Sequence, residues 1–392
     1  MNRFFRSMLR EYRAVLGDPA VRLIFVAGMV IYTMFYPVPY LREVLREVDI
    51  IPVDQDLTPL SRKLTRWVDA AEETRLTEPA RDLEEARRRM LNGEARGVLV
   101  IPAGFERDIL RGEQAVVQVY GDASYFLVYR QIYSGVYRAA ATLSAGIEIR
   151  RLTASGLPEK EAYKAREPFG VIGRPLYNPF GGYSVYVVPA VLMLIIQQTM
   201  LLGIGLLGGT RNELRGEKAA EEVRRSGPLA VLTARTAALV SLYMLYPVFY
   251  LAVVYTFYGL PREGNPITVL VFLLPYVISI ALFGQMLTAF FPERETALPV
   301  LLFTSVPAVF LMRFAWPPEV LPGWIRAVSL LLPSSTGGVG FVRVNQMGAS
   351  LFEVRREWLI LWALCGLYLV LAWLVLFVRK PAAEPQTPEQ SA

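Results

Sequence analysis

The chain of 392 residues contains no histidine and only one cysteine, Cys365. Histidine is the commonest general base and the commonest transition-metal ligand, so the chain lacks the residue that enzymes use most often in both roles. The sequence also shows no convincing nucleophile motif and no metal-ligand spacing. One cysteine cannot form an internal disulfide, so cysteine usage says nothing about the redox compartment. We therefore expect no catalytic residue, no metal site and no enzymatic activity in this chain.

The sequence also lacks the G-x-x-x-x-G-K-[ST] loop that holds nucleotide phosphates. If the protein moves a solute, the energy must therefore come from another chain. The long apolar segments contain no ionisable relay, which disfavours proton- or ion-coupled transport. Arg235 and Arg313 lie at the ends of such segments, where their side chains can snorkel toward the membrane surface.

Long uncharged runs dominate the composition, which is 54% hydrophobic. Residues 175–210 include no Lys, Arg, Asp or Glu. About 20 apolar residues of helix cross a bilayer core of about 30 Å, so this run can span a membrane. The net charge of +6 comes from arginines that cluster beside such runs. These arginines indicate topology, and we expect no nucleic-acid partner.

The uncharged runs predict a membrane α-helical fold with six transmembrane helices. The first occupies residues 20–41, and its apolar run continues to Tyr40 without the small-x-small site of a cleaved signal peptide. Residues 175–380 form the five-helix remainder, in which Pro247 predicts a kink in the third span. The five later spans are expected at about 183–207, 236–261, 267–291, 296–312 and 358–378. Residues 381–392 are expected to be a disordered tail.

Residues 1–19 predict an amphipathic helix at the membrane interface. Arg3, Arg6, Arg10 and Arg13 fall on one arc, and apolar residues fall on the opposite arc. Such a helix lies on the membrane with its arginines toward anionic headgroups or a protein partner. A soluble helix docked on a partner would look similar, but the adjacent span favours membrane lipid.

Residues 42–174 differ from the rest because they are charged and alternate short strands with helices. Strands are expected at 48–53, 97–101 and 115–120, and helices at 60–71, 79–91 and 124–155. This order predicts an inserted α/β domain.

Residues 317–350 contain two apolar pieces, 324–332 and 338–344, which are too short to cross a bilayer. The segment from Pro333 to Gly338 is expected to separate them. The pattern predicts a re-entrant helical hairpin before the last span, and a surface amphipathic hairpin is the alternative.

The basic residues that flank the spans predict the orientation. Short flanks carry 13 Lys and Arg on the side of the termini and 6 on the other side. The excess marks the cytoplasmic side. We expect both termini in the cytoplasm, the α/β domain outside, and the chain in a bacterial plasma (inner) membrane.

Three consecutive polar residues, Gln197, Gln198 and Thr199, lie in the middle of the second span. An amide that faces lipid finds no water, so these groups turn toward protein or an aqueous cavity. They either bond a neighbouring helix or line a translocation path. In the second case, Thr304 and Ser305 of the fifth span are expected to add hydrogen bonds to the same path.

Taken together, these features resemble a permease subunit of the ABC type-2 exporter family, in its drug-efflux-like branch with a large extracytoplasmic domain. The resemblance covers essentially the whole chain. The local strings that carry it are Tyr177-Asn178-Pro179, Gln197-Gln198-Thr199, Leu332-Pro333-Ser334-Ser335 and Asn345-Gln346-Met347-Gly348-Ala349-Ser350.

The resemblance implies a second permease chain, identical or not, and cytoplasmic ABC ATPase subunits that bind ATP and Mg; no cofactor is expected in this chain. It also implies that residues 211–228 form a cytoplasmic coupling loop, with Glu213, Arg215, Glu217 and Glu222 contacting the ATPase. Many relatives carry a Gly-Thr-x-Glu pattern followed by Thr-Pro, whereas this chain has Ser226-Gly227-Pro228. A solvated charged loop would explain the composition equally well.

The resemblance implies ATP-driven export. A few hydrogen-bonding groups in an otherwise apolar path suit amphipathic or hydrophobic small molecules, drug-like or lipid-like, better than ions. The external domain could dock a periplasmic adaptor. The alternative is a non-transporting membrane scaffold or sensor whose external domain binds a ligand or partner.

Overall fold

The computed structural model describes residues 3–40, 45–167, 169, 171, 173–178, 182–213, 223, 225–312 and 319–378. The chain divides into two units, one made of residues 1–43 and 175–392 and the other of residues 44–174. The tail expected at 381–392, part of the loop at 211–228 and the start of the hairpin expected at 317–350 lie outside the described residues.

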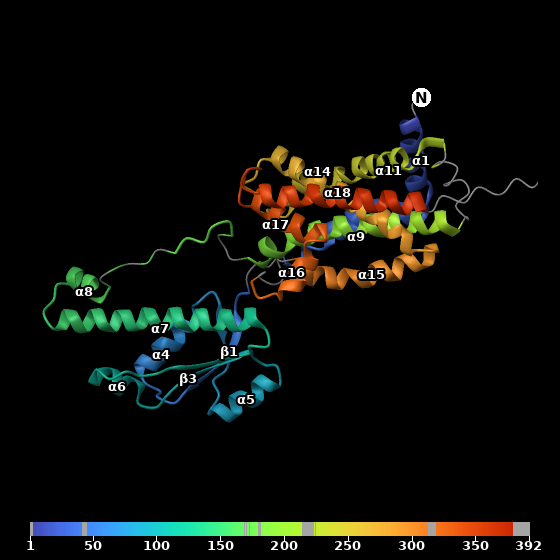
Figure 1. Cartoon of the computed structure of the whole chain (residues 1–392). Helices are drawn as coiled ribbons and strands as arrows, with labels where there is room; N and C mark the ends of the chain where they lie inside the picture. Colours follow the sequence, from blue (N-terminus) through green and yellow to red (C-terminus); the bar gives the residue numbers. More distant parts are fainter. Residues whose placement is uncertain are drawn as a thin grey trace, which may run out of the picture. The chain divides into compact units, whose positions relative to one another are not determined.

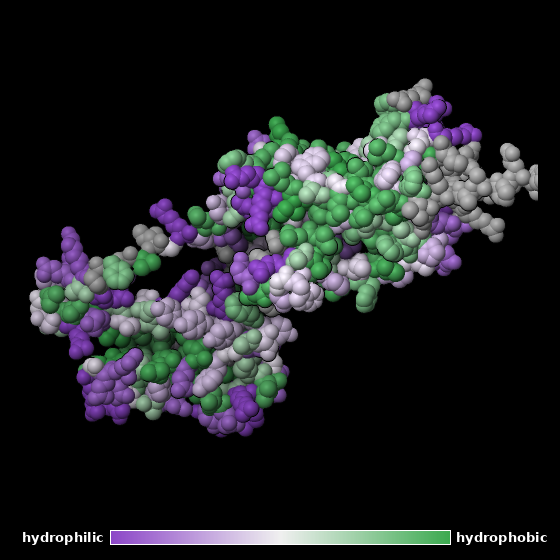
Figure 2. Space-filling view, viewed as in Figure 1, coloured by the Kyte–Doolittle hydropathy of each residue, from purple (hydrophilic) through white to green (hydrophobic). Residues whose placement is uncertain are grey.

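The first unit is a helical bundle (Figure 1). Among its described residues, six helical segments are long and apolar enough to cross a membrane, or seven if the hairpin is counted as a span. They are Pro19–Tyr40, Tyr183–Glu213, Pro228–Phe257, Pro266–Phe290, Arg294–Leu311 and Arg355–Phe377. Hydrophobic residues cover much of the visible face of this bundle (Figure 2). The predicted membrane α-helical fold is therefore confirmed.

Helix α9 (Tyr183–Glu213) is the most enclosed of these segments. It packs against the first span, α14 (Pro266–Leu287), α15 (Arg294–Leu311) and the hairpin helix α17 (Pro333–Asn345). Glycines allow these neighbours to approach closely. A Cβ at Gly203 would overlap the Phe25 ring, and one at Gly209 would lie 2.6 Å from the Cα of Arg294.

Two spans contain widened or broken turns. The first is built from α2 (Pro19–Arg22), the π-helical η1 (Leu23–Gly28), α3 (Met29–Phe35) and η2 (Val38–Tyr40). The third is built from α11 (Pro228–Tyr243), α12 (Leu245–Phe249), the π-helical η3 (Tyr250–Val254) and α13 (Tyr255–Phe257). The break between α11 and α12 lies where the predicted kink at Pro247 removes an N–H and crowds the preceding turn. Tyr246 then donates to the carbonyl oxygen of Phe25 in the first span.

The hairpin before the last span consists of α16 (Gly323–Ser329) and α17, which meet at 82°. The expected division at 333–338 is wrong, because α17 already begins at Pro333. Proline suits the first helical position since it has no N–H to leave unpaired. The following glycines, Gly337 and Gly340, let α17 press against the rings of Tyr276 and Phe272. The last span is α18 (Arg355–Val378).

The N-terminal helix α1 (Arg3–Gly17) packs against α11. Its buried residues are Ser7, Glu11 and Val15, and only Val15 belongs to the apolar arc expected from the sequence. The four arginines of α1 are exposed, and so are several of its apolar side chains: Phe5, Leu9 and Leu16. Exposed residues of both kinds are compatible with the interfacial position, which remains a prediction.

The second unit contains a four-stranded sheet of order β2-β1-β3-β4. Strand β1 (Val48–Asp54) is parallel to β2 (Thr74–Leu76) and β3 (Gly97–Ile101), and β4 (Gln118–Gly121) is antiparallel to β3. Buried residues of the central strands belong to two separate clusters, as expected for a sheet covered on both faces. The helices of this unit are α4 (Pro59–Asp69), α5 (Leu83–Leu91), α6 (Phe105–Arg111), α7 (Phe126–Ala154) and α8 (Glu159–Arg166). The inserted unit is α/β, as predicted.

Candidate functional site

A groove of about 610 Å³ opens beside the middle of α9. Its walls come from α9, α14, α15, α18 and the bend of the hairpin, and nearly all of them are aliphatic or aromatic. The residues that line it are Gln197, Gln198, Leu201, Phe283, Met286, Leu287, Phe290, Phe291, Val300, Leu301, Thr304, Pro307, Ala308, Leu311, Val328, Leu331, Leu332, Leu367, Tyr368 and Leu371. A mostly apolar groove with a few polar groups is the usual form of a small-molecule site.

The side chain of Gln197 holds the hairpin against α9. It is 1% exposed, and its Oε1 accepts a 2.8 Å hydrogen bond from the backbone N–H of Ser334. Ser334 lies in the first turn of α17, where backbone N–H groups have no partner within the helix. The next hydroxyl, that of Ser335, donates to the carbonyl oxygen of Leu311 in α15 at 2.7 Å. The bend is thus fixed by polar contacts to two spans.

The neighbouring residues of the polar triplet face different surroundings. Gln198 lines the groove, and its buried Oε1 has no hydrogen-bond partner among the described residues. Thr199 donates to the carbonyl oxygen of Ile195 at 2.7 Å and lies 3.6 Å from the sulfur of Met29 in the first span. Thr199 is not among the groove residues. The structure therefore separates three residues that the sequence presents as one group.

The two hydroxyls predicted on the fifth span also differ. Thr304 lines the groove, whereas Ser305 is not among its residues. Both hydroxyls donate to carbonyl oxygens three residues earlier in α15, those of Leu301 and Leu302. A threonine bonded in this way can still accept a hydrogen bond from a molecule in the groove. The participation of all five residues in a path remains a prediction.

At the far end of α9, a buried carboxylate joins three helices. Glu11 of α1 is 4% exposed and pairs with Arg211 of α9 at 2.5 Å. Arg235 of α11 lies 3.8 Å from the same Oε2 atom and is 8% exposed. The expectation that Arg235 snorkels at a span end is wrong, because Glu11 gives it a buried partner. Sequence reasoning missed Glu11, although it is the only acidic residue of α1.

A second ion pair lies at the same end. The Asp18 carboxylate accepts hydrogen bonds from both Nη groups of Arg294, the first residue of α15. It also caps α2, because it accepts hydrogen bonds from the backbone N–H groups of Ala20 and Val21. The hydrogen bonds from Arg294, assisted by the cap, lower the pKa of the Asp18 carboxyl to about 2, against the opposing effect of burial. Glu213 accepts from the backbone N–H of Arg294 at 2.5 Å. Together these contacts join α2, α9 and α15.

Of the residues proposed for coupling, only Glu213 is described, and it is the last residue of α9. Arg215, Glu217 and Glu222 lie outside the described residues. The N-terminal helix reaches the same region, because Arg3 donates to the carbonyl oxygen of Arg225 at 3.0 Å. The coupling role of all four residues remains a prediction.

Among the described residues, six segments can cross a membrane and four of them line the mid-bundle groove, as in a multi-pass membrane protein. Residues 20–374 match the family model of the ABC-2 family transporter protein, so the chain belongs to that family. The predicted ABC type-2 permease is confirmed, while its placement in the drug-efflux-like branch remains a prediction. No curated protein matches the sequence significantly.

Membership of the family has consequences for activity and partners. The chain is a permease subunit of an ABC transporter, a component that is not itself catalytic and that associates with an ABC ATPase. Among the described residues, no three His, Cys, Asp or Glu side chains gather as they would around a metal ion.

Proposed function

We propose that the chain is the permease subunit of an ATP-driven exporter of amphipathic or hydrophobic small molecules. It acts in a bacterial plasma membrane with both termini in the cytoplasm. It pairs with a second permease chain and with cytoplasmic ATPase subunits that hold ATP and Mg. The inserted α/β unit lies outside, where it can meet a periplasmic adaptor.

The observation that carries the cargo class is the composition of the groove. Its aliphatic and aromatic walls favour an apolar molecule, since burial of apolar surface contributes about 25 cal/mol per Å². Gln198 lines this space and has a buried amide oxygen without a hydrogen-bond partner among the described residues, and Thr304 adds a hydroxyl. A cargo with an apolar body and one hydrogen-bond donor satisfies both features.

The ion pairs at the far end of α9 support a route for coupling. A displacement of the loop after Glu213 acts on α15 through Arg294 and on α1 through Arg211 and Glu11. Because α9 and α15 both line the groove, a relative movement of the two helices changes its width. ATP binding at the partner thereby opens the groove outward.

Transport in reconstituted vesicles tests the proposal. The chain with its ATPase should move a rhodamine-class amphipathic dye in an ATP-dependent manner. Gln198→Leu should change the rate or the dye preference, and Ser305→Ala should not, since Ser305 does not line the groove. ATP hydrolysis without dye movement in the wild type would contradict export of this cargo class.

The orientation has its own test. In intact cells, an impermeant thiol reagent should label Leu110→Cys in the α/β unit and spare Ser226→Cys. The native Cys365 is buried and should give little background. The reverse labelling pattern would contradict the proposed topology.

A further inference from the structure

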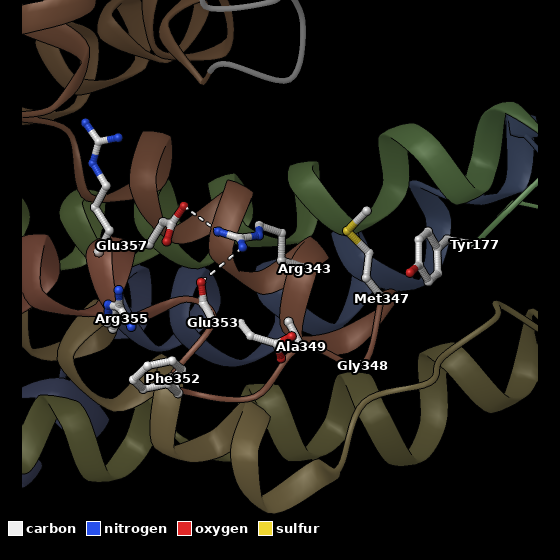
Figure 3. A pocket seen from close by; sticks show the side chains of 10 residues that line it. Tyr177, Arg343, Met347, Gly348, Ala349, Phe352, Glu353, Arg355 and Glu357 are labelled. Carbon is white, nitrogen blue, oxygen red and sulfur yellow. Dashed lines mark hydrogen bonds and ion pairs between the residues drawn. The ribbon is translucent and has the colours of Figure 1, made fainter.

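Two of the family-like strings meet at a place that the transport groove does not include. Residues Met347, Gly348 and Ala349 and residue Tyr177 line a cavity of about 660 Å³ together with the start of α18. We call this cavity the arginine cup (Figure 3). Its remaining residues are Arg343, Phe352, Glu353, Arg355, Arg356 and Glu357.

The backbone around the cup adopts uncommon conformations. Tyr177 has φ of 63° and Gly348 has φ of 71°. A positive φ is unfavourable for a tyrosine, and such residues tend to persist where a binding site requires them. Gly348 also lies close to Glu263, since an added Cβ would be 3.3 Å from that residue's carbonyl oxygen. The shape of the cup is thus held by two constrained positions.

Some of the charged groups of the cup are bonded within the protein, and others are not. Arg343 donates to Glu357 Oε1 at 2.8 Å and to the carbonyl oxygen of Glu353 at 3.0 Å, as Figure 3 shows. The Glu353 carboxylate accepts from the N–H and hydroxyl of Ser350, and these bonds lower its pKa. Both groups are therefore occupied within the protein.

Two arginines at the start of α18 remain available. Arg355 and Arg356 are exposed and form no ion pair with a carboxylate among the described residues. The guanidinium of Arg355 lies 4.3 Å from the ring centre of Phe352, which orients it without neutralising its charge. A guanidinium group offers several N–H donors to the oxygens of a phosphate, and these two side chains, about 100° apart on α18, would approach it from different directions.

The cup also contains an unpaired acceptor. Glu357 Oε1 is bonded to Arg343, but Glu357 Oε2 is buried and has no hydrogen-bond partner among the described residues. An unpaired buried acceptor is costly, so a donor from a bound molecule would be favoured there. The cup therefore offers cations for a phosphate and an acceptor for a nearby donor.

The cup lies at one end of the helical bundle. Gln346, next to Met347, donates to the carbonyl oxygen of Val185 near the start of α9, and the apolar span of α18 begins at Arg355. The ion pairs of Asp18 and Glu213 lie at the opposite end of α9, about 45 Å away for a helix of this length. Phe352 and Tyr177 are 72% and 44% exposed, as aromatic residues at a membrane surface often are.

We propose that the arginine cup binds a phosphodiester headgroup that carries a hydrogen-bond donor, as phosphatidylethanolamine and phosphatidylglycerol do. Arg355 and Arg356 hold the phosphate oxygens. Glu357 Oε2 accepts from the ammonium or hydroxyl group of the ligand, and Tyr177 and Phe352 cover it from the side. The site is independent of the cargo groove and does not require that the chain export anything.

Thermal unfolding of the purified full-length chain in detergent tests the proposal. Titration with dioleoyl phosphatidylethanolamine or phosphatidylglycerol should raise the unfolding midpoint of the wild type, because a ligand of the folded state stabilises it. Dioleoyl phosphatidylcholine, which has no donor, should act at least tenfold more weakly. The double variant R355Q/R356Q should also require at least tenfold more lipid. The matched control R326Q changes an exposed arginine of α16 outside the cup and should behave like the wild type.

Soluble glycerophosphoethanolamine separates two sources of the same chemistry. If this compound raises the unfolding midpoint only slightly and the lipid raises it strongly, the ligand of the cup is a membrane lipid. If both raise the unfolding midpoint equally, the ligand is a free phosphodiester. The proposal is overturned if the double variant responds to lipid like the wild type, if phosphatidylcholine acts equally well, or if no phosphodiester changes the wild-type midpoint.

Discussion

The Oε1 atom of Gln197 and the backbone N–H of Ser334 are 2.8 Å apart and join the centre of α9 to the bend of the hairpin. The adjacent Gln198 lines the groove, and its own Oε1 has no hydrogen-bond partner in the part of the chain that the structure describes. One residue therefore stabilises the bundle, while its neighbour is available to a ligand.

Gln197→Leu should destabilise the protein more than Gln198→Leu does. The first substitution leaves the Ser334 N–H buried without a partner, which costs about 1–3 kcal/mol, and the second removes an oxygen that has no partner. Unfolding midpoints of the two variants, measured at the same protein concentration, check the difference. Equal losses in both variants would mean that the Gln197 contact contributes little.

Glu11→Gln should lower stability by about 3 kcal/mol, because it leaves the buried Arg235 facing a neutral group. Arg6→Gln on the exposed face of the same helix is the control and should change stability by less than about 0.5 kcal/mol. The double variant Glu11→Leu/Arg235→Leu should recover part of the loss, since it also removes the more buried of the two guanidinium groups that face Glu11, while Arg211 keeps 23% of its side chain exposed. A single variant as stable as the control would show that Glu11 is not needed to neutralise Arg235.

The Asp18 carboxyl predicts a loss of stability in acid. Its pKa is lowered to about 2 in the folded chain, so the contribution is present above the unfolded value near 4 and is lost as the pH falls toward 2. Linkage gives this contribution a size of about 2 kcal/mol. Asp18→Asn keeps an N-cap for α2 but removes the charge, so its unfolding midpoint should fall less than that of the wild type between pH 5 and pH 2. If the unfolding midpoints of the two proteins fall equally between pH 5 and pH 2, the Asp18 carboxylate is not the source of the acid sensitivity.

Gly209→Ala should destabilise the contact between α9 and α15 by about 1–3 kcal/mol. The added Cβ would lie 2.6 Å from backbone atoms of Glu293 and Arg294, which cannot move aside as a flexible side chain could. Gly366→Ala in α18 is the control, because nothing lies within 4 Å of its added Cβ. It should be neutral or should stabilise by up to about 1 kcal/mol. A similar unfolding midpoint for both variants would show that α15 moves away from α9 at little cost.

The spans could be predicted from the sequence because a bilayer requires long uncharged runs, whatever their partners. The ends of the spans were less predictable. The third span is expected from 236 because the charge of Arg235 marks its end in the sequence, yet α11 begins at Pro228. Glu11 accounts for Arg235, and Gln285 of α14 donates to Thr236 at 2.9 Å. Contacts between distant residues therefore extend the helix.

The candidate site was predictable only as a set of polar residues at membrane depth. The sequence shows that adjacent side chains on a helix point about 100° apart, but not which neighbour each side chain meets. The division between Gln197, Gln198 and Thr199 depends on the positions of Ser334, the groove and Met29. The short elements β2 and α6 were missed because three to seven residues carry too little periodicity.

The glycines of α9 restrict how this helix can move. Gly203 meets Phe25 of the first span, Gly205 meets Leu301 of α15, and Gly208 meets Thr288 at the end of α14. Each glycine lies where an added Cβ would crowd a neighbour, and Leu202, Ile204, Leu206 and Leu207 stand beside them on the helix. A turn of α9 about its own axis would drive those side chains into all three neighbours at once. The close contacts oppose rotation of α9 among its neighbours, so we expect the walls of the groove to change mainly when packed helices tilt or slide together.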